Sequence, residues 1–389
     1  MTSLVGSVLL GNCIVSGFIA SILCDKLGCR QTCALGAVFT AAGLGASFFA
    51  KSCAFLIASF GIVTGAGLII SYLAVQVSVA YYFQERRPFA MAFIQVGSSV
   101  GQVVVAPLTH YFVDEYTWRG AMLLLSAISL HLLVVAALLR PHRKEHLHKK
   151  LKTGVLFDFT VLKNVSLLLI MLNAALMNVV LGLLLFHLPA YAVSSGTSVH
   201  KVSLLLSLIG FTGLFLRPLF GAAMNHPDVD MWTVFSISQT LVGVIMIISP
   251  IFMTDFSGQV IFVLIFGTYT TPYFAGFAAM TLECVESKHQ GAALALFQSG
   301  SGVGLLLGPF IGGWVYSLTG SYASGVQFAG GCLLVNTVVM FALKLSSGKN
   351  STEKMAEVGK LDHVTSGRAN YCPSEPIGST ENVDFRNSL

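Results

Sequence analysis

Long apolar stretches, separated by short polar segments, follow one another along the chain from residue 3 to about residue 345. A helix that crosses the hydrocarbon core of a bilayer needs about 20 mostly apolar residues, and eleven stretches meet this requirement. The predicted spans are 3–24, 32–50, 54–82, 87–112, 117–140, 165–192, 200–224, 231–252, 257–282, 289–317 and 321–345. The pattern therefore predicts an all-α protein that lies mostly within a lipid bilayer.

One polar segment is longer than the others and divides the predicted spans into groups of five and six. Residues 140–152 read RPHRKEHLHKKLK, which is too polar to lie in hydrocarbon. We predict an N-terminal helical bundle over 1–140, a linker over 141–164 and a C-terminal bundle over 165–345. Residues 346–389 are polar and rich in Ser, Thr and Asn, and this composition predicts a disordered tail.

Composition and charge agree with this division. The chain is 55% hydrophobic and only 10% charged, whereas a soluble domain carries about 25% charged residues. Lys and Arg gather on one predicted side, together with the linker and the tail, and positively charged loops stay in the cytoplasm. The linker and tail are therefore predicted to be cytoplasmic. The net charge of +5 is spread over loops and tail, which excludes the basic face typical of nucleic-acid binding.

The side chains that carry covalent or metal chemistry form no recognisable group. The eight cysteines lie mostly inside apolar runs, without regular CxxC spacing or a neighbouring histidine cluster. We therefore predict no disulfide scaffold, no metal site and no cofactor. Because no catalytic constellation is present either, we do not expect an enzyme.

An internal repeat links the two predicted bundles. Residues 90–101 and 293–304 both follow the pattern A-x-A-x-x-Q-x-G-S-x-V-G, and Pro107 and Pro309 follow at nearly equal distances. Duplication of a bundle explains this match. The alternative is that glycine and serine recur because small residues let membrane helices pack closely. The first copy lies in the fourth span and the second in the fifth span of its group, so duplication predicts that one helix is missing at the N-terminus.

Two short motifs stand out at predicted helix ends, because residues 25–30 read DKLGCR and residues 82–90 read YFQERRPFA. The first resembles a loop typical of the major facilitator superfamily, and the second resembles the YF-x-x-RRPLA signature of one of its families, the monocarboxylate transporters. Further matches are residues 118–120 (WRG), the segment from Phe211 through Arg217-Pro218 to Gly221, and Gly308-Pro309 with Gly312-Gly313. The resemblance covers about residues 3–345.

The resemblance implies a major facilitator fold of twelve helices in two bundles that works by alternating access. It implies transport of small monocarboxylates or related metabolites across the plasma membrane, and a single-span, immunoglobulin-type escort protein as a partner. Two features depart from the family. The first helix, with a binding lysine, is expected to be missing, and Gly213 stands where the family often has an aspartate, which puts proton coupling in doubt. The alternative function is a non-transporting, truncated form that acts through association with other proteins.

Arg217 is the main candidate for substrate binding. An arginine inside a span is costly in hydrocarbon and usually faces a cavity or a partner. Its guanidinium can hold a carboxylate through two hydrogen bonds. The alternatives are an arginine paired with a carbonyl or with Glu283, or one that reaches the interface.

Four charged residues at predicted cytoplasmic helix ends are candidates for a gate: Asp25, Arg30, Arg86 and Arg87. Charge pairs at such ends can form and break as two bundles move about a central site. The alternative for the cations is that they only set the orientation in the membrane.

Polar residues within spans are candidates for lining a cavity. The residues selected are Gln76, Gln95, Asn173, Tyr273 and Gln298. For each of them the alternative is a hydrogen bond between helices. The glycines of the two repeats, Gly97, Gly101, Gly300 and Gly304, are expected to let neighbouring helices approach closely.

Overall fold

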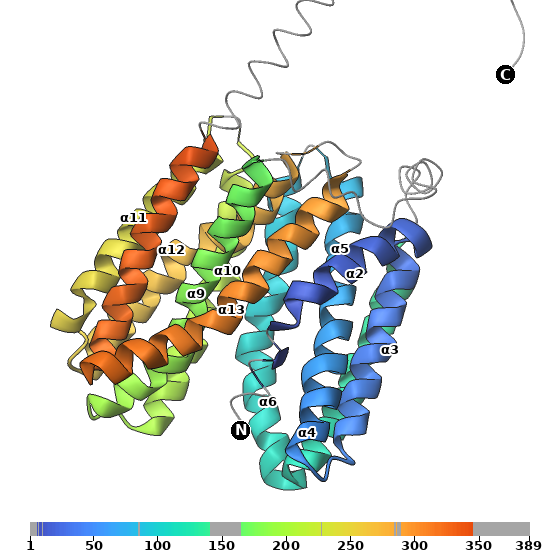
Figure 1. The fold of residues 1–389 in the computed structure, drawn as a ribbon, viewed down its shortest axis with the longest axis horizontal. Helices are drawn as coiled ribbons and strands as arrows, with labels where there is room; N and C mark the ends of the chain where they lie inside the picture. The colour runs from blue at the N-terminus through green and yellow to red at the C-terminus, as the bar shows by residue number, and fades with distance from the viewer. Residues whose placement is uncertain are drawn as a thin grey trace, which may run out of the picture. The chain divides into compact units, whose positions relative to one another are not determined.

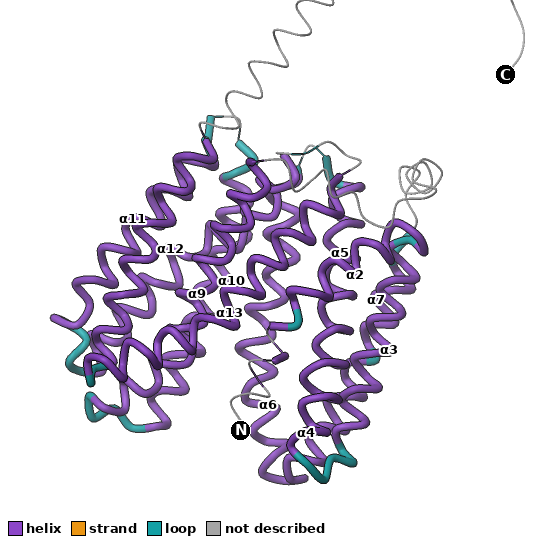
Figure 2. The backbone as a smooth tube through the Cα atoms, in the orientation of Figure 1, coloured by secondary structure: helices purple, strands orange, loops and turns teal. Residues whose placement is uncertain are grey.

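Helices make up nearly all of the described chain, and no strand occurs within it (Figure 2). The computed structural model describes residues 6, 8, 9, 11–84, 86–140, 165–226, 228–283, 285 and 289–344. The predicted linker over 141–164 and the predicted tail over 346–389 lie outside these residues, and so does part of the first predicted span.

The helices of the first half occupy the blue to cyan part of Figure 1 and follow the predicted spans closely. They are α2 (Cys13–Leu27), α3 (Cys29–Ser47), α4 (Cys53–Leu56), the π-helical segment η1 (Ile57–Thr64), α5 (Gly65–Tyr82), α6 (Arg87–Ser129) and α7 (His131–Leu138). The segments α4, η1 and α5 form one continuous span, Cys53–Tyr82.

The helices of the second half also match the predicted spans to within a few residues. They are α9 (Val165–Ser194), α10 (Val199–Ala223), α11 (Met231–Ile248) with the short 3-10 turn η3 (Ser249–Ile251), α12 (Phe256–Glu283), α13 (Gln290–Thr319) and the helix Tyr322–Lys344. Thus the all-helical fold class is confirmed.

Nine helices within the described residues are long and apolar enough to cross a membrane, compared with eleven predicted spans. The two that are not counted are α2, whose described part has 15 residues, and α3, which begins with polar residues. The total of eleven therefore stays a prediction, as do the boundaries of the two bundles.

Helix α6 contains two of the predicted spans, and the chain bends between them. Thr117 has φ 62° and ψ 169° inside this helix, a left-handed backbone that a β-branched residue rarely adopts. Two residues later, Arg119 donates a hydrogen bond of 3.0 Å to the carbonyl of Ala50. This contact ties the bend to the segment that follows α3.

Helices from the two halves pack along two seams. At the first, α6 packs against α10; at the second, α2 packs against α13 (Figure 1). In both pairs the helices run antiparallel, because Gly221 lies against Ala92 while Gly210 lies against Gln102, and because Gly17 lies against Ala295 while Gly11 lies against Leu306. The first copy of the repeat thus forms one seam and the second copy forms the other.

Candidate functional site

Arg217 lies at the first seam, where it joins the two halves of the chain. Its side chain extends from α10 and is only 5% exposed. The guanidinium donates short hydrogen bonds to the carbonyl of Gln95 and to the hydroxyl of Ser98, both on α6. It also lies 4.8 Å from the centre of the Phe274 ring on α12, which is within the range of a cation–π interaction.

No carboxylate among the described residues neutralises this arginine. Its contacts are a carbonyl, a hydroxyl and an aromatic ring, and Nε has no hydrogen-bond partner. Glu283, one of the predicted alternatives, interacts electrostatically with Arg87 instead. The predicted alternative of a carbonyl partner is confirmed, yet a buried charge with only neutral partners remains.

Gly213 allows α10 to lie directly on α6 beside this arginine. A Cβ atom at this position would lie 2.6 Å from Oγ of Ser99 and 3.0 Å from Nε of Arg217. Any side chain here would therefore have to displace one of these groups. The Ser99 hydroxyl is itself buried and has no hydrogen-bond partner.

Three of the predicted cavity-lining residues continue the polar contacts from this seam into α5 and α13. Gln95 accepts a hydrogen bond of 2.6 Å from the phenol of Tyr72. Gln298 donates one of 3.4 Å to the side-chain oxygen of Gln76. The phenol of Tyr72 also lies near Arg217 and Tyr273.

Tyr273, on α12, adds a polar group from the second half of the chain. Its hydroxyl accepts a hydrogen bond of 3.0 Å from Asn178 on α9. Its ring stacks on Phe277 with centroids 5.1 Å apart and lies 6.4 Å from Phe297. We call Arg217 with Tyr72, Gln76, Gln95, Gln298 and Tyr273 the polar layer. The layer draws on α5, α6, α10, α12 and α13, and an anion could be held there by charge and by hydroxyl and amide groups.

Asn173 is the predicted residue that does not join these contacts. It is fully buried in α9, and neither its side-chain oxygen nor its nitrogen has a hydrogen-bond partner. It is therefore neither a residue of the polar layer nor part of an interhelical hydrogen bond.

The chain matches one family model, described as Major Facilitator Superfamily, over residues 1–272 and again over 232–370. The chain belongs to this superfamily of membrane transporters. It is 27% identical to monocarboxylate transporter 4 of Gallus gallus, an alignment that covers 91% of this chain and 78% of that protein. It is 24% identical to monocarboxylate transporter 12-B of Danio rerio, over 90% and 80% of the two chains. It is thus a monocarboxylate transporter-like member.

Solved structures of the superfamily share this fold. The human organic anion transporter MFSD10 (TETRAN) aligns with a TM-score of 0.71 and 16% identity, over 87% of this chain and 83% of that one. The fucose:proton symporter of E. coli aligns with a TM-score of 0.72 and 13% identity, over 88% and 90%. The expected class, a multi-pass transporter rather than an enzyme, is confirmed.

Sequence reasoning missed three neighbours of Arg217 in this major facilitator protein. Ser98 belongs to the repeat and could have been suspected from its place three residues after Gln95. Tyr72 is one of three tyrosines in α5, which is a weak signal. Phe274 gave no signal, because phenylalanine is ordinary in a membrane helix.

The four gate candidates lie near helix ends, as expected. Asp25 is half-buried in the last turn of α2, whereas Arg30 in α3 and Arg86 before α6 are exposed. Arg87, the first residue of α6, is half-buried, and its Nε has no hydrogen-bond partner. Its electrostatic interaction with Glu283 links α6 to the end of α12. A gating role for the four residues stays a prediction.

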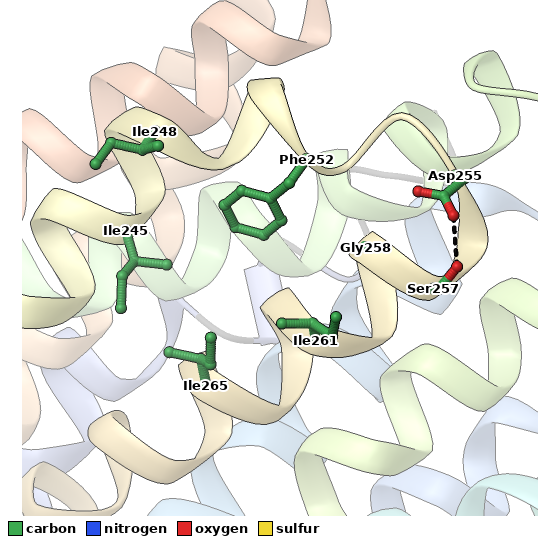
Figure 3. A pocket seen from close by; sticks show the side chains of 8 residues that line it. All are labelled: Ile245, Ile248, Phe252, Asp255, Ser257, Gly258, Ile261 and Ile265. Carbon is green, nitrogen blue, oxygen red and sulfur yellow. Dashed lines mark hydrogen bonds between the residues drawn. The ribbon is translucent and has the colours of Figure 1, made fainter.

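A separate groove lies between one end of α11 and the start of α12, away from the polar layer. Figure 3 shows its apolar lining, which includes Ile245, Phe252 and Ile261. Asp255 at its edge accepts a short hydrogen bond from Ser257. None of the predicted site residues lines this groove.

Proposed function

We propose that the chain transports small organic anions, such as monocarboxylates or related metabolites, across the plasma membrane by alternating access. In this proposal Arg217 binds the carboxylate of the solute. The observation that carries the proposal is the buried guanidinium of Arg217, which among the described residues has only neutral partners, on α6 and α12, and an Nε without a hydrogen-bond partner.

The physical argument starts from the cost of this charge. A buried cation without a counter-ion is unfavourable in a membrane, so a solute that brings a negative charge would gain from binding there. A guanidinium suits a carboxylate because it offers two parallel donors. The names of the relatives and of one structural neighbour, an organic anion transporter, support the same class of solute.

Alternating access needs contacts at the seams that can exchange. The hydrogen bonds of Arg217 to Gln95 and Ser98 join α10 to α6. A bound carboxylate would compete for the same donors and so loosen the first seam. The pair Arg87 and Glu283, together with Asp25, Arg30 and Arg86, would then serve as a gate at the helix ends.

Substitution of Arg217 tests the proposal. We expect Arg217→Ala to lower uptake of a labelled panel (lactate, pyruvate, creatine and carnitine) by about a hundredfold, the value of roughly two lost charge-assisted hydrogen bonds. Arg119→Lys is the control, since the contacts of Arg119 with the Ala50 carbonyl and the Trp118 ring lie outside the polar layer. Uptake is measured in proteoliposomes at equal protein content, with the internal pH recorded to reveal or exclude proton coupling.

Two results would contradict the proposal. Equal uptake by wild type and Arg217→Ala would remove Arg217 from solute binding. No uptake of any panel member by the wild type would favour the alternative, a protein that acts by association. Co-purification with an immunoglobulin-type, single-span protein would then be the first measurement to make.

A further inference from the structure

Within the described residues of the second half, three buried amides have no hydrogen-bond partner at either side-chain atom. They are Asn173 on α9, Gln239 on α11 and Asn336 on the helix Tyr322–Lys344. Asn173 and Asn336 are fully buried and Gln239 is 4% exposed. In each of the three, both the side-chain nitrogen and the side-chain oxygen are buried and lack a partner. Buried amides without partners are rare and costly, and in functional proteins they point to water or a ligand.

One of the three amides, Gln239, lines a cavity, and the other two share helix faces with residues that line it. Gln239 lines it directly, together with Met177 and Leu333. Asn173 precedes Met177 by one helical turn and Asn336 follows Leu333 by about one turn, so each shares a helix face with a lining residue. The neighbouring pair Thr240 and Thr337 is joined by a hydrogen bond of 3.3 Å, which places Gln239 and Asn336 at the same level.

The cavity is separated from the polar layer by one side chain. Tyr273 lines the cavity and is itself a residue of the polar layer, where it lies near Tyr72. The next residue along α12, Phe274, carries the ring that lies against Arg217. A solute whose carboxylate is at Arg217 therefore has the cavity directly behind Tyr273.

Water alone does not satisfy these amides in the present conformation. The cavity has room for about one water molecule. One water makes about four hydrogen bonds at most, whereas three amides can make more than that. The hydrogen-bonding capacity that one water leaves unused is available to another polar group.

We infer that this cavity is a second recognition site, which binds an uncharged hydrogen-bonding group of the transported solute. The lining has no charged side chain, and besides Gln239 it offers the polar groups of Ser238, Tyr269 and Thr270. It therefore suits a hydroxyl, an amide or a similar neutral group. This inference rests on the proposed function, since Arg217 has to hold the carboxylate at the other end of the solute.

Matched pairs of solutes test the inference. Butyrate and 4-hydroxybutyrate, and hexanoate and 6-hydroxyhexanoate, differ only by an uncharged terminal hydroxyl. We expect the wild type to transport the hydroxy member of at least one pair with a KM about tenfold below that of its alkanoate, the value of roughly one good hydrogen bond. Gln239→Met and Asn336→Leu, measured separately, should bring this ratio of KM values close to one.

A partnered amide supplies the control. Gln259 on α12 is fully buried, and it accepts a hydrogen bond of 2.9 Å from Thr197. Gln259→Met should therefore lower the melting temperature of the purified protein but leave the ratio as in wild type. By contrast, Gln239→Met and Asn336→Leu remove polar groups that have no partner, so their melting temperatures should not fall.

The outcomes separate the inference from the proposed function. If the alkanoates enter but no pair shows a preference, or if the preference survives both substitutions, the cavity holds only structural water and the inference is wrong. If no carboxylate enters at all, the proposed function fails and this site fails with it.

Discussion

Helices α6 and α13 carry the two copies of the same sequence pattern, yet they lie in very different surroundings. In the most apolar window of α13, 61% of the residues are buried, compared with 24% in the first span of α6. A Cβ atom at Gly304 would lie 2.2 Å from the carbonyl of Ala175 on α9, and one at Gly300 would lie 2.3 Å from that of Met171. At Gly97 and Gly101, in the first copy, no described atom lies within 4 Å.

The difference teaches that a small-residue pattern does not determine its own neighbour. The glycines of α13 let α9 approach to backbone contact, as expected for closely packed membrane helices. The expectation of the same role for Gly97 and Gly101 is wrong for the described structure, because α6 packs on α10 with another face. There the close approach is made by Gly213 and Gly221 of α10.

The largest effect is expected from a substitution that disrupts the packing of α13 and leaves α6 unchanged. Gly304→Leu should prevent folding or lower stability by about 3 kcal/mol or more, because the side chain would meet the backbone of α9, which cannot move aside. Gly101→Leu, the matched change in the first copy, should change stability by less than about 1 kcal/mol. Melting temperature and monodispersity of the purified variants check both expectations.

Equal losses of stability in Gly304→Leu and Gly101→Leu would contradict this interpretation. A strong loss in Gly101→Leu would mean that a helix covers this face of α6 in the assembled protein. A mild effect in Gly304→Leu would mean that α9 and α13 pack less closely than described.

Substitution of Gln95 or Gln298, the glutamines at the same position of the two repeats, should have an effect of intermediate size. Gln95 accepts a hydrogen bond of 2.6 Å from Tyr72, whereas Gln298 reaches Gln76 at 3.4 Å. Loss of a short bond should cost about 1 kcal/mol and loss of a long one less. We therefore expect Gln95→Leu to raise the KM for anion uptake about fivefold, and Gln298→Leu to raise it less.

Initial rates over a range of solute concentrations, with equal amounts of protein, measure this difference. Arg217 contacts the main-chain carbonyl of Gln95, so the substitution leaves that contact in place. If Gln298→Leu raised the KM more than Gln95→Leu does, the solute would bind nearer to the second seam than to the first.

Much of the fold could be predicted from the sequence, because apolar length alone identifies a membrane helix. The burial of Arg217 and its carbonyl partner could also be foreseen, since a cation within a span has few alternatives. What hydropathy could not supply is the identity of neighbours. The contacts of Tyr72 and Phe274, and the open face at Gly97, depend on which helix packs where.

Local backbone features were equally invisible to the pattern. The π-helical turns of η1 (Ile57–Thr64) lie beside Gly43, where a Cβ atom would meet Oγ1 of Thr64 at 2.4 Å. The left-handed Thr117 interrupts α6 without a glycine or proline at that position. Neither feature leaves a mark in the order of apolar residues.

The smallest effect is expected from a substitution at the start of α11. We compare this helix start with that of α3, the helix at the matching place in the first half. Gly28 precedes α3 without a side-chain cap. Asp230 caps α11, accepting hydrogen bonds from the backbone of Trp232, from Thr233 and, at 2.6 Å, from Lys344. Burial opposes ionisation of this aspartate, but these hydrogen bonds outweigh it and hold the pKa of its carboxyl below the usual value.

Because the pKa of Asp230 is lower in the folded state, its stabilisation is complete above the unfolded pKa of about 4 and is lost as the pH falls through the lower folded value. The carboxylate and Lys344 are each nearly half exposed, so the ion pair contributes less than about 1 kcal/mol and the cap about 1 kcal/mol. Asp230→Asn should therefore lower the melting temperature slightly at pH 7. The gap between variant and wild type should narrow as the pH falls below about 4. If the difference in melting temperature stayed constant from pH 7 to pH 3, the effect would come from neutral capping. The charge of Asp230 would then not stabilise the start of α11, and in this respect α11 would not differ from α3.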